Sequence, residues 1–546
     1  MREEADVLII GAGPVGLLLA LDLAWRGVAT TVVEARPAGL APSVKCNHVS
    51  SRTMETLRRL GLSRDVRAVG LPNDYPNDIV FRTRMTGTEL TRIPIPCRRN
   101  RYTDHSGPDG NWPTPEPPHR VNQIYFEPIF FAHAARNPLI NILSHTQFET
   151  AREDDGGVAA DVVSLDDGTR RTLRARYLVG CDGGSSGVRK LIGGKLEGDA
   201  VVQRVQSTLI DAPDLLGALG SKPAWMNYNY NPDRAGTVLA IDGVRRWLVH
   251  NYLRPEEETF EEVDRDGGIR NILGVGPDFP ITQVANEDWI GRRLVANRFR
   301  QGRMFIAGDA AHLWVPYAGY GMNAGIADAM NLSWKLAATL KGWASDAILE
   351  AYVDERKPIT EQVSRFAMGH AGGAIKERNT LPPEIEDATP AGEAARRSVG
   401  EAAYALNVQQ YACAGLNYGY YYEGSPLIVY DGEAAPAYTM HDYTPSTVPG
   451  CRVPHLFLAD GRSLYDLLGQ DYTLLTLDRS ADPQPLLDAA RERSVPLTWL
   501  PLDRVNDHVP EVYRHAMLLV RPDGHVAWRG DACADPAALI DRIRGA

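Results

Sequence analysis

The sequence predicts an α/β protein of several domains that opens with a βαβ unit of a parallel sheet. Three observations predict this class. Residues 7–25 (VLIIGAGPVGLLLALDLAW) are an apolar run broken by glycines, residues 224–253 alternate apolar and polar positions, and residues 446–546 mix short apolar runs with a helical segment. The chain has 546 residues, which fits roughly three or four domains.

The opening segment is predicted as strand, turn, helix and strand. An apolar strand over 6–10 leads into a glycine-rich turn, and a helix over 14–26 ends at Gly27, the usual position after a C-cap. A second strand over 30–33 is apolar enough to lie inside a parallel sheet, and it ends at Glu34.

The turn has the spacing Gly11-x-Gly13-x-x-Gly16 of a dinucleotide-binding fold. Gly11 permits the tight turn, Gly13 leaves room for a pyrophosphate, and Gly16 lets helix and strand pack closely. The start of the helix offers unpaired N–H groups to phosphates, and Glu34 can accept hydrogen bonds from both ribose hydroxyls. These residues predict a bound FAD or NAD; a glycine-rich turn without a ligand is the alternative.

Two later segments, 177–181 and 304–307, resemble the first strands in character and are predicted to join their sheet. The intervening and following segments differ. Residues 103–119 are rich in Pro and Gly and predict an irregular surface segment, residues 224–253 predict antiparallel strands, and residues 324–369 follow a helical pattern.

A carboxylate follows the strand at 304–307. Asp309, at the carboxyl edge of a sheet, can bind a hydroxyl chain such as the ribityl chain of a flavin. The N–H groups that begin the next helix, at Gly321, Met322 and Asn323, can stabilise negative charge on a reduced isoalloxazine. Together these residues favour FAD over NAD, whereas each alone could be a solvated loop residue or a helix cap.

Composition excludes several classes of partner. The net charge of −11, without clustered Lys or Arg, argues against nucleic acid and anionic membranes. The acidic start MREEAD, and Pro14 and Asp22 within the apolar run, argue against a signal peptide or membrane span. The six cysteines show no C-x-x-C and no His at metal spacing, which predicts no metal site and a reducing compartment. We expect a cytoplasmic protein, compatible with a homodimer.

Three stretches carry a family resemblance: GAGPVG with Glu34, CDGGSSGVRKLIG at 181–193 and AGDAAHLWVPYAGYGMNAGIADAMNLSWKL at 307–336. In order and spacing they resemble the single-component FAD-dependent aromatic hydroxylases, the group A flavoprotein monooxygenases. The last stretch is most similar to the 3-(3-hydroxyphenyl)propionate hydroxylase branch. The tail over 419–546 is similar to that of the phenol and 2,4-dichlorophenol hydroxylases, which carry a thioredoxin-like third domain.

The resemblance implies an FAD-binding Rossmann-like domain of the GxGxxG type, an inserted antiparallel-sheet substrate domain and a C-terminal thioredoxin-like domain. The expected boundaries are 1–75, 120–195 and 286–375 for the FAD-binding domain, 76–119 and 196–285 for the substrate-binding sheet domain, 376–445 for a helical and linker region, and 446–546 for the thioredoxin-like domain. Cys451 and Cys533 form no C-x-x-C pair, so we expect a structural or interface role for this last domain.

The resemblance also implies contacts for individual residues. Asp182 and Gly183 match the family's Asp-Gly motif, which serves both FAD and NAD(P)H, although Asp182 could instead cap the following helix. Gln123 matches a flavin-contacting Gln. Lys45 and Arg52 lie where the family brings basic side chains near the FAD phosphates, although Arg52 could be on a solvated helix face.

The implied reaction is hydroxylation of a phenolic or phenol-like small molecule with NAD(P)H and dioxygen, through a flavin hydroperoxide. FAD is expected to be noncovalent, because no His, Cys or Tyr belongs to a flavin-linking motif. GVGPDF at 274–279 has Pro and Asp where a helix would begin, so it is no second nucleotide fold, and NAD(P)H is expected to dock transiently. The alternative function is a non-hydroxylating flavoprotein, either an NAD(P)H oxidase or a redox-dependent scaffold.

A phenolic substrate needs its proton removed or held, which favours a Tyr or His beside the ring. The strands at 224–253 offer Tyr228, Tyr230 and His250, although each could be an ordinary sheet residue. The aromatic loop over 314–320, which includes Tyr317, is the next candidate for the pocket wall.

Overall fold

The first sheet is built on the βαβ unit, in a computed structural model that describes residues 4–40, 44–314, 319–478 and 480–546. Its order is β15-β16-β8-β1-β2-β5, and the strands from β16 to β5 are parallel. A hairpin of β6 and β7 extends the sheet from β8. The bounds are β1 Glu4–Ile10, β2 Thr30–Val33, β5 Ile140–Leu143, β6 Thr146–Asp154, β7 Gly157–Ser164, β8 Arg170–Gly180, β15 Arg300–Gln301 and β16 Met304–Ile306. The predicted opening unit is confirmed.

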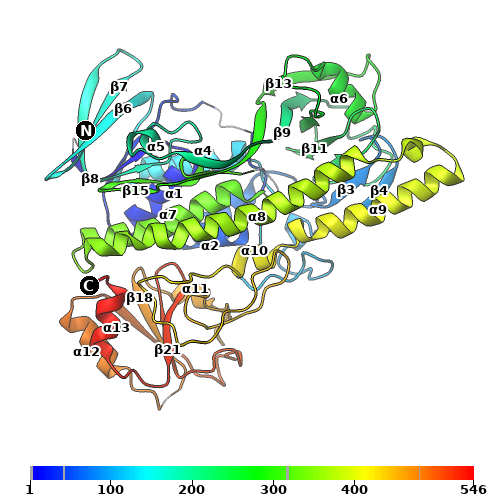
Figure 1. Ribbon diagram of the computed structural model, residues 1–546. Coiled ribbons are helices and arrows are strands. Elements are labelled where there is room, and N and C mark those ends of the chain that lie inside the picture. The colour runs from blue at the N-terminus through cyan, green and yellow to red at the C-terminus, as the bar shows by residue number, and fades with distance from the viewer. Residues whose placement is uncertain (1–3, 41–43, 315–318, 479) are drawn as a thin grey trace.

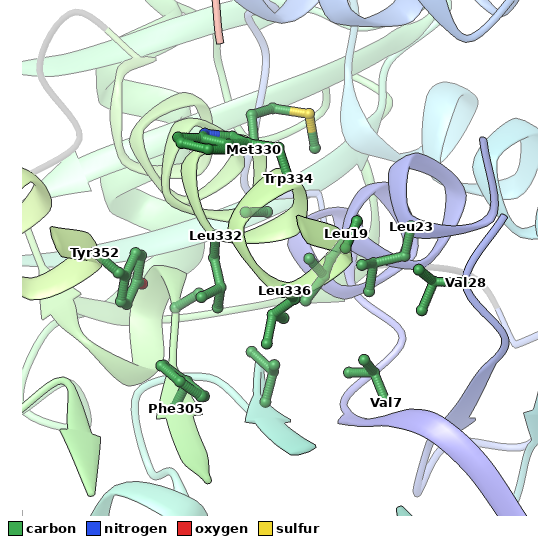
Figure 2. Packing of buried hydrophobic residues seen from close by; sticks show 14 of the residues in the cluster. Val7, Leu19, Leu23, Val28, Phe305, Met330, Leu332, Trp334, Leu336 and Tyr352 are labelled. Carbon is green, nitrogen blue, oxygen red and sulfur yellow. The ribbon is translucent and has the colours of Figure 1, made fainter. Parts of the chain in front are cut away.

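Two helices pack side by side on this sheet, α1 (Pro14–Trp25) and α7 (Gly321–Leu340). Figure 2 shows Leu19 and Leu23 of α1 beside Leu336 of α7. Val7 of β1 belongs to the same core. All four side chains are fully buried. Because the sheet and α7 enclose α1, that helix can be apolar on nearly every side.

The second sheet contains the predicted antiparallel strands, in the order β17-β14-β9-β12-β11-β10-β3-β4 with β13 paired to β9. Its strands are β3 Ile79–Arg82, β4 Glu89–Ile93, β9 Leu196–Asp211, β10 Met226–Asn229, β11 Gly236–Ala240, β12 Arg246–Tyr252, β13 Thr282–Asn286, β14 Trp289–Ala296 and β17 His312–Leu313. We assigned the residues after 285 to the FAD-binding part, but β14 hydrogen-bonds to β9 in this second sheet. The domain boundaries themselves stay predictions.

Long helices connect the parts of the molecule. The helical pattern over 324–369 forms two helices, α7 and α8 (Ala351–Asn379), separated by a short turn at Asp346–Leu349. Figure 1 shows α8 running past both sheets and α9 (Pro390–Tyr411) returning beside it. The shorter helices are α2 Ser51–Arg59, α3 Ser63–Ala68, α4 Gln123–Arg136, α5 Gly187–Leu191, α6 Arg265–Leu273 and α10 Ala414–Tyr418.

The C-terminal domain has a four-stranded sheet in the order β19-β18-β20-β21. Its elements are β18 Tyr472–Thr476, α12 Gln484–Glu492, β19 Leu497–Pro501, β20 Met517–Val520, β21 Val526–Gly530 and α13 Pro536–Ile543, preceded by the short helix α11 Leu464–Leu467. The pair β18–β19 is parallel and the other pairs are antiparallel, which is the arrangement of a thioredoxin-like core. Figure 1 places this domain on the side of α8 opposite the two large sheets.

The two cysteines of this domain are free thiols. Burial raises the pKa of Cys451 to about 11 and also raises that of Cys533, so neither is a reactive thiolate at neutral pH. We therefore expect the double variant Cys451→Ser and Cys533→Ser to keep the activity that the resemblance implies within a few-fold of that of the wild-type protein. The measurement is steady-state NAD(P)H oxidation with a confirmed substrate, and a large loss of activity in a folded variant would show a redox role for the domain.

No helix in the described part of the chain is both long and apolar enough to cross a membrane. Within the same residues, no group of three or more His, Cys, Asp or Glu side chains is placed to hold a metal ion.

Candidate cofactor and substrate site

The glycine-rich turn leaves open space at one position. Gly11 has a φ of +104°, and a Cβ there would lie 2.4 Å from the carbonyl oxygen of Cys181. A Cβ at Gly16 would lie 2.0 Å from the carbonyl oxygen of Gly11. At Gly13, the N-cap of α1, a Cβ would meet nothing within 4 Å. The protein itself thus requires glycine at the first and third positions, while the second faces space that a ligand can fill.

An acidic and basic cluster lines a cavity of about 360 Å³ at the end of β2. The Glu34 carboxylate accepts hydrogen bonds from the backbone N of Ala12 (2.7 Å) and from Arg36 Nε (3.0 Å). Arg36 Nη2 also donates to Glu127 of α4 (2.9 Å). Arg36 and Glu127 were not among the predicted site residues. Arg36 could have been found as a basic residue two positions after Glu34, and Glu127 as an acid one helical turn after Gln123.

Asp309 follows β16 in a short turn and faces a second cavity, of about 220 Å³. The described residues donate no hydrogen bond to its carboxylate. The surrounding protein raises the pKa of Asp309 above its usual value, against the opposing influence of His312 and Lys45. Gly321 and Met322, at the start of α7, line the same cavity. The site therefore places an exposed carboxylate next to a helix N-terminus.

A buried ionic cluster is hydrogen-bonded to the turn that carries Asp309. His312 Nε2 lies 2.6 Å from Asp328 Oδ2, and Arg356 Nε donates to Asp328 Oδ1 at 2.8 Å. Asp328 also accepts the backbone N–H of Gly308 (3.2 Å). Although burial opposes ionisation, His312 and Arg356 hold the pKa of Asp328 below its usual value. The cluster fixes the backbone that presents Asp309.

Strands β10 to β12 form the opposite wall of the cavity. Tyr228 and His250 line it, together with Tyr411 from the end of α9. The hydroxyls of Tyr228 and Tyr411 are 2.7 Å apart, and the Tyr228 ring stacks on Phe81. Burial lowers the pKa of His250 to about 4, so its imidazole is neutral at pH 7. One cavity thus joins the Asp309 turn to aromatic and polar side chains of the second sheet.

Two models of known protein families match this chain. Residues 4–367 match a family model described as an FAD binding domain, and residues 446–545 match one described as aromatic-ring hydroxylase, C-terminal. This chain belongs to the FAD-dependent aromatic-ring hydroxylases. The predicted family, its FAD cofactor and the predicted fold class are confirmed.

The hydroxylase resembles its relatives over nearly its full length. It is 32% identical to the FAD-dependent monooxygenase apdD of Emericella nidulans, over 97% of this chain and 88% of that protein. It is 29% identical to phenol 2-monooxygenase of a Pseudomonas species, over 99% and 93% of the two chains. The structure of the rebeccamycin biosynthetic enzyme RebC with reduced flavin superposes with a TM-score of 0.89, at 32% identity and 99% coverage of both chains.

Two of the expected cofactor residues of this hydroxylase have other roles. Arg52 of α2 lies over the ring of Tyr420, at 5.0 Å, and approaches His525 of the C-terminal domain rather than either cavity. Asp182 accepts hydrogen bonds from the N-cap of α5, Ser186 Oγ, and from the backbone N–H of Val188 in the first turn, so it supports the start of that helix. The bonding capacity of each side chain is used for packing between elements or for capping.

Three other expected residues lie close to the cavities. Gln123 begins α4, and its side-chain amide donates to Glu127 at 2.6 Å. Lys45 lines the cavity of Asp309 and is ion-paired with Glu287 at 2.9 Å. The Asn323 side chain is occupied by the backbone oxygens of residues 48 and 319 and by the groups it accepts from residues 50 and 53, so only its backbone can face a ligand.

Tyr230 is not part of the cavity wall. It follows the last residue of β10, and its ring lies edge-on to that of Tyr228 with the centroids 6.3 Å apart, but its hydroxyl donates to Glu377 of α8 at 2.8 Å and the residue does not line the cavity. Tyr230 is therefore not placed to handle the substrate proton in this cavity, contrary to the prediction. Within the loop over 314–320, Trp314 and Gly319 line the cavity, while Tyr317 lies outside the described residues.

Proposed function

We propose that this hydroxylase binds a phenolic aromatic compound between Asp309 and strands β10 to β12 and hydroxylates it with NAD(P)H and dioxygen. The observation that carries the proposal is the shared cavity: Asp309, Gly321 and Met322 line it on one side, and Tyr228 and His250 on the other. A substrate ring held in this cavity would lie against the flavin, whose ribityl chain Asp309 would bind. We also propose that the enzyme can work as a homodimer, which light scattering of the purified protein tests.

The residues present fit FAD. Gly13 and the first turn of α1 would hold the pyrophosphate, and Glu34 with Arg36 would hold the adenosine ribose. Asp309 would accept the ribityl hydroxyls, and the N–H groups of residues 321–323 would stabilise negative charge on the ring system. Bound FAD supplies the redox chemistry and the activation of dioxygen.

The two polar side chains on the opposite wall have different roles. Neutral His250 can accept a hydrogen bond from the phenolic O–H at a ring nitrogen, and a pKa of about 4 makes it an orienting group rather than the base that takes the proton. Burial raises the pKa of Tyr411 far above its usual value. Tyr411 therefore stays protonated, so it would orient the hydroxyl of Tyr228, 2.7 Å away, toward a substrate oxygen and would not remove a proton. The aromatic walls exclude water from the reacting centre.

The variants Tyr228→Phe and His250→Ala are expected to uncouple the reaction. Without a group that orients or deprotonates the phenol, oxygen transfer should slow by about 30-fold, which corresponds to about 2 kcal/mol. NAD(P)H would still be consumed, with hydrogen peroxide replacing the hydroxylated product. Product, peroxide and NAD(P)H are measured together with each phenol that stimulates NAD(P)H oxidation in the wild-type enzyme.

Tyr230→Phe is the matched control, because Tyr230 is an equally buried tyrosine that bonds to Glu377 outside the cavity. It should stay fully coupled. Full coupling in the Tyr228 and His250 variants as well would place the substrate elsewhere. NAD(P)H oxidation that responds to no phenol would favour the non-hydroxylating alternative.

A further inference from the structure

A buried guanidinium faces the substrate cavity without a hydrogen bond. Arg120 lines the cavity and is only 5% exposed. It lies between His119, which pairs with Val49, and Asn122, which caps α4. None of the described residues hydrogen-bonds to its guanidinium, and Nη2 is enclosed without a partner. Since a buried charge is costly unless it is paired and hydrogen-bonded, this side chain lacks the partner that its position requires.

The neighbours of Arg120 explain its position but do not neutralise its charge. The guanidinium lies over the rings of Trp225 (4.8 Å) and Tyr411 (5.8 Å). The carboxylate of Asp109 is 3.9 Å from Nη2, beyond hydrogen-bond distance. That carboxylate already accepts a hydrogen bond from Arg101 Nη2 at 2.9 Å. Two guanidinium groups therefore share one carboxylate, which leaves positive charge at the cavity wall.

The other charged groups that line the cavity are engaged or neutral. Lys45 is ion-paired with Glu287, and His250 is neutral at pH 7. Asp309 is the acceptor assigned above to the cofactor. Among the described residues of the cavity wall, Arg120 is thus the cation that has donors to spare. Its planar fork matches a carboxylate with two parallel hydrogen bonds, and its charge persists at any working pH.

We propose that Arg120 binds an anionic oxygen, either a carboxylate or a phenolate, of the aromatic substrate. The aromatic ring would lie along Trp225 and Tyr411, with the anionic oxygen in the plane of the guanidinium. This inference rests on the proposed function, because it requires that the cavity hold the substrate. A carboxylate and a phenolate share this chemistry, and the experiment separates them.

The experiment measures ligand binding to the FAD-loaded enzyme through changes in the flavin absorbance. The probes are 3-hydroxybenzoate with 3-hydroxybenzamide, and 6-hydroxy-2-naphthoate with 6-hydroxy-2-naphthamide, each acid having a neutral partner of nearly equal shape. A third probe, 4-nitrophenol, reports the pKa of a bound phenol from its own absorbance. The variants are Arg120→Gln, Arg120→Lys and, as the matched control, Arg245→Gln, which removes an exposed arginine paired with Asp211.

If a carboxylate is the ligand, the wild-type enzyme should bind an acid at least about tenfold more tightly than its amide. Arg120→Gln should remove this preference, Arg120→Lys should keep part of it, and Arg245→Gln should keep it all. If a phenolate is the ligand, Arg120→Gln should instead raise the pKa of bound 4-nitrophenol. No acid preference together with no change in that pKa overturns the proposal.

Two further readouts separate the possible failures. Arg120→Met should leave the melting temperature of the holoenzyme unchanged or higher, because it removes a buried charge that only shares the Asp109 carboxylate with Arg101. A drop of many degrees would show a structural role and overturn the inference. If the amides perturb the flavin but the acids bind no better, only the Arg120 inference fails. If no aromatic probe perturbs the flavin, the proposed substrate cavity fails, and this inference fails with it.

Discussion

Glu355→Gln is expected to lower the free energy of unfolding by about 3–5 kcal/mol, the cost of removing one charge from a buried ion-pair network in which Arg521 keeps Asp523 as its second partner. Glu355 of α8 is fully buried. Its carboxylate accepts hydrogen bonds from Arg521 (2.6 and 2.8 Å), Lys335 (2.7 Å), Asn331 (2.7 Å) and Ser425 (2.5 Å). Since Lys335 belongs to α7 and Arg521 follows β20, the loss should loosen the docking of the C-terminal domain.

Denaturant unfolding of the holoenzyme measures this effect, and Glu350→Gln is the control. Glu350 is also ion-paired, with Arg300, but its side chain is 66% exposed, so its loss should cost about 1 kcal/mol or less. Similar stability of the two variants would contradict the prediction.

The same carboxylate predicts a pH dependence. Although burial opposes ionisation, Arg521 and Lys335 hold the pKa of Glu355 well below its usual value of 4.5. The unfolded chain therefore takes up this proton first as the pH falls, so the contribution of Glu355 is complete above pH 4.5 and is lost below it. The wild-type enzyme should lose more stability than Glu355→Gln between neutral pH and pH values below 4.5. Parallel acid profiles of the two proteins would exclude this assignment.

Asp309→Ala and Glu34→Ala are each expected to weaken FAD binding by roughly 10- to 150-fold. Each variant removes a charged acceptor of cofactor hydroxyls, and such hydrogen bonds contribute about 1.5–3 kcal/mol. Asp309 should show the effect without loss of the apoprotein fold, because no described residue donates to it. The measurement is titration of apoprotein with FAD, after acid has released the flavin; flavin that remains in the precipitate would show a covalent link.

The glycines of the first turn provide the matched comparison. Gly13→Ala should fold normally, since its Cβ meets nothing within 4 Å, but it should bind FAD poorly. Gly16→Ala should destabilise the apoprotein itself, because its Cβ would lie 2.0 Å from the Gly11 oxygen. Unchanged FAD affinity in the Asp309, Glu34 and Gly13 variants would refute the cofactor site.

The site was predictable from the sequence wherever its residues follow one another along the chain. Gly11, Gly13, Gly16 and Glu34 sit on a single strand–turn–helix–strand unit, and the described geometry of that unit follows from its local pattern. Asp309 also follows a buried strand directly. Parallel strands present their carboxyl ends at one edge, so such residues converge without further information.

The roles of other residues depended on their place in the folded structure rather than on a pattern in the sequence. Tyr228 and Tyr230 have the two-residue spacing that places side chains on one face of a strand. The two rings are indeed neighbours, with centroids 6.3 Å apart, but the hydroxyl of Tyr230 reaches Glu377 of α8, so only Tyr228 lines the cavity. Helical periodicity placed Arg52 on a helix but could not show that the C-terminal domain covers that face.

The sequence by itself determined the dinucleotide turn and a separate α/β domain at the C-terminus, because hydrophobic period and glycine spacing are local properties. The family followed from the resemblance of three stretches, GAGPVG with Glu34, residues 181–193 and residues 307–336. Only the tertiary structure decided which side chains share the substrate cavity. Tyr411 reaches Tyr228 across 183 residues, and Arg120 meets both Trp225 and Tyr411. Contacts between segments so far apart are fixed by how sheets and helices pack, and no local pattern records that packing.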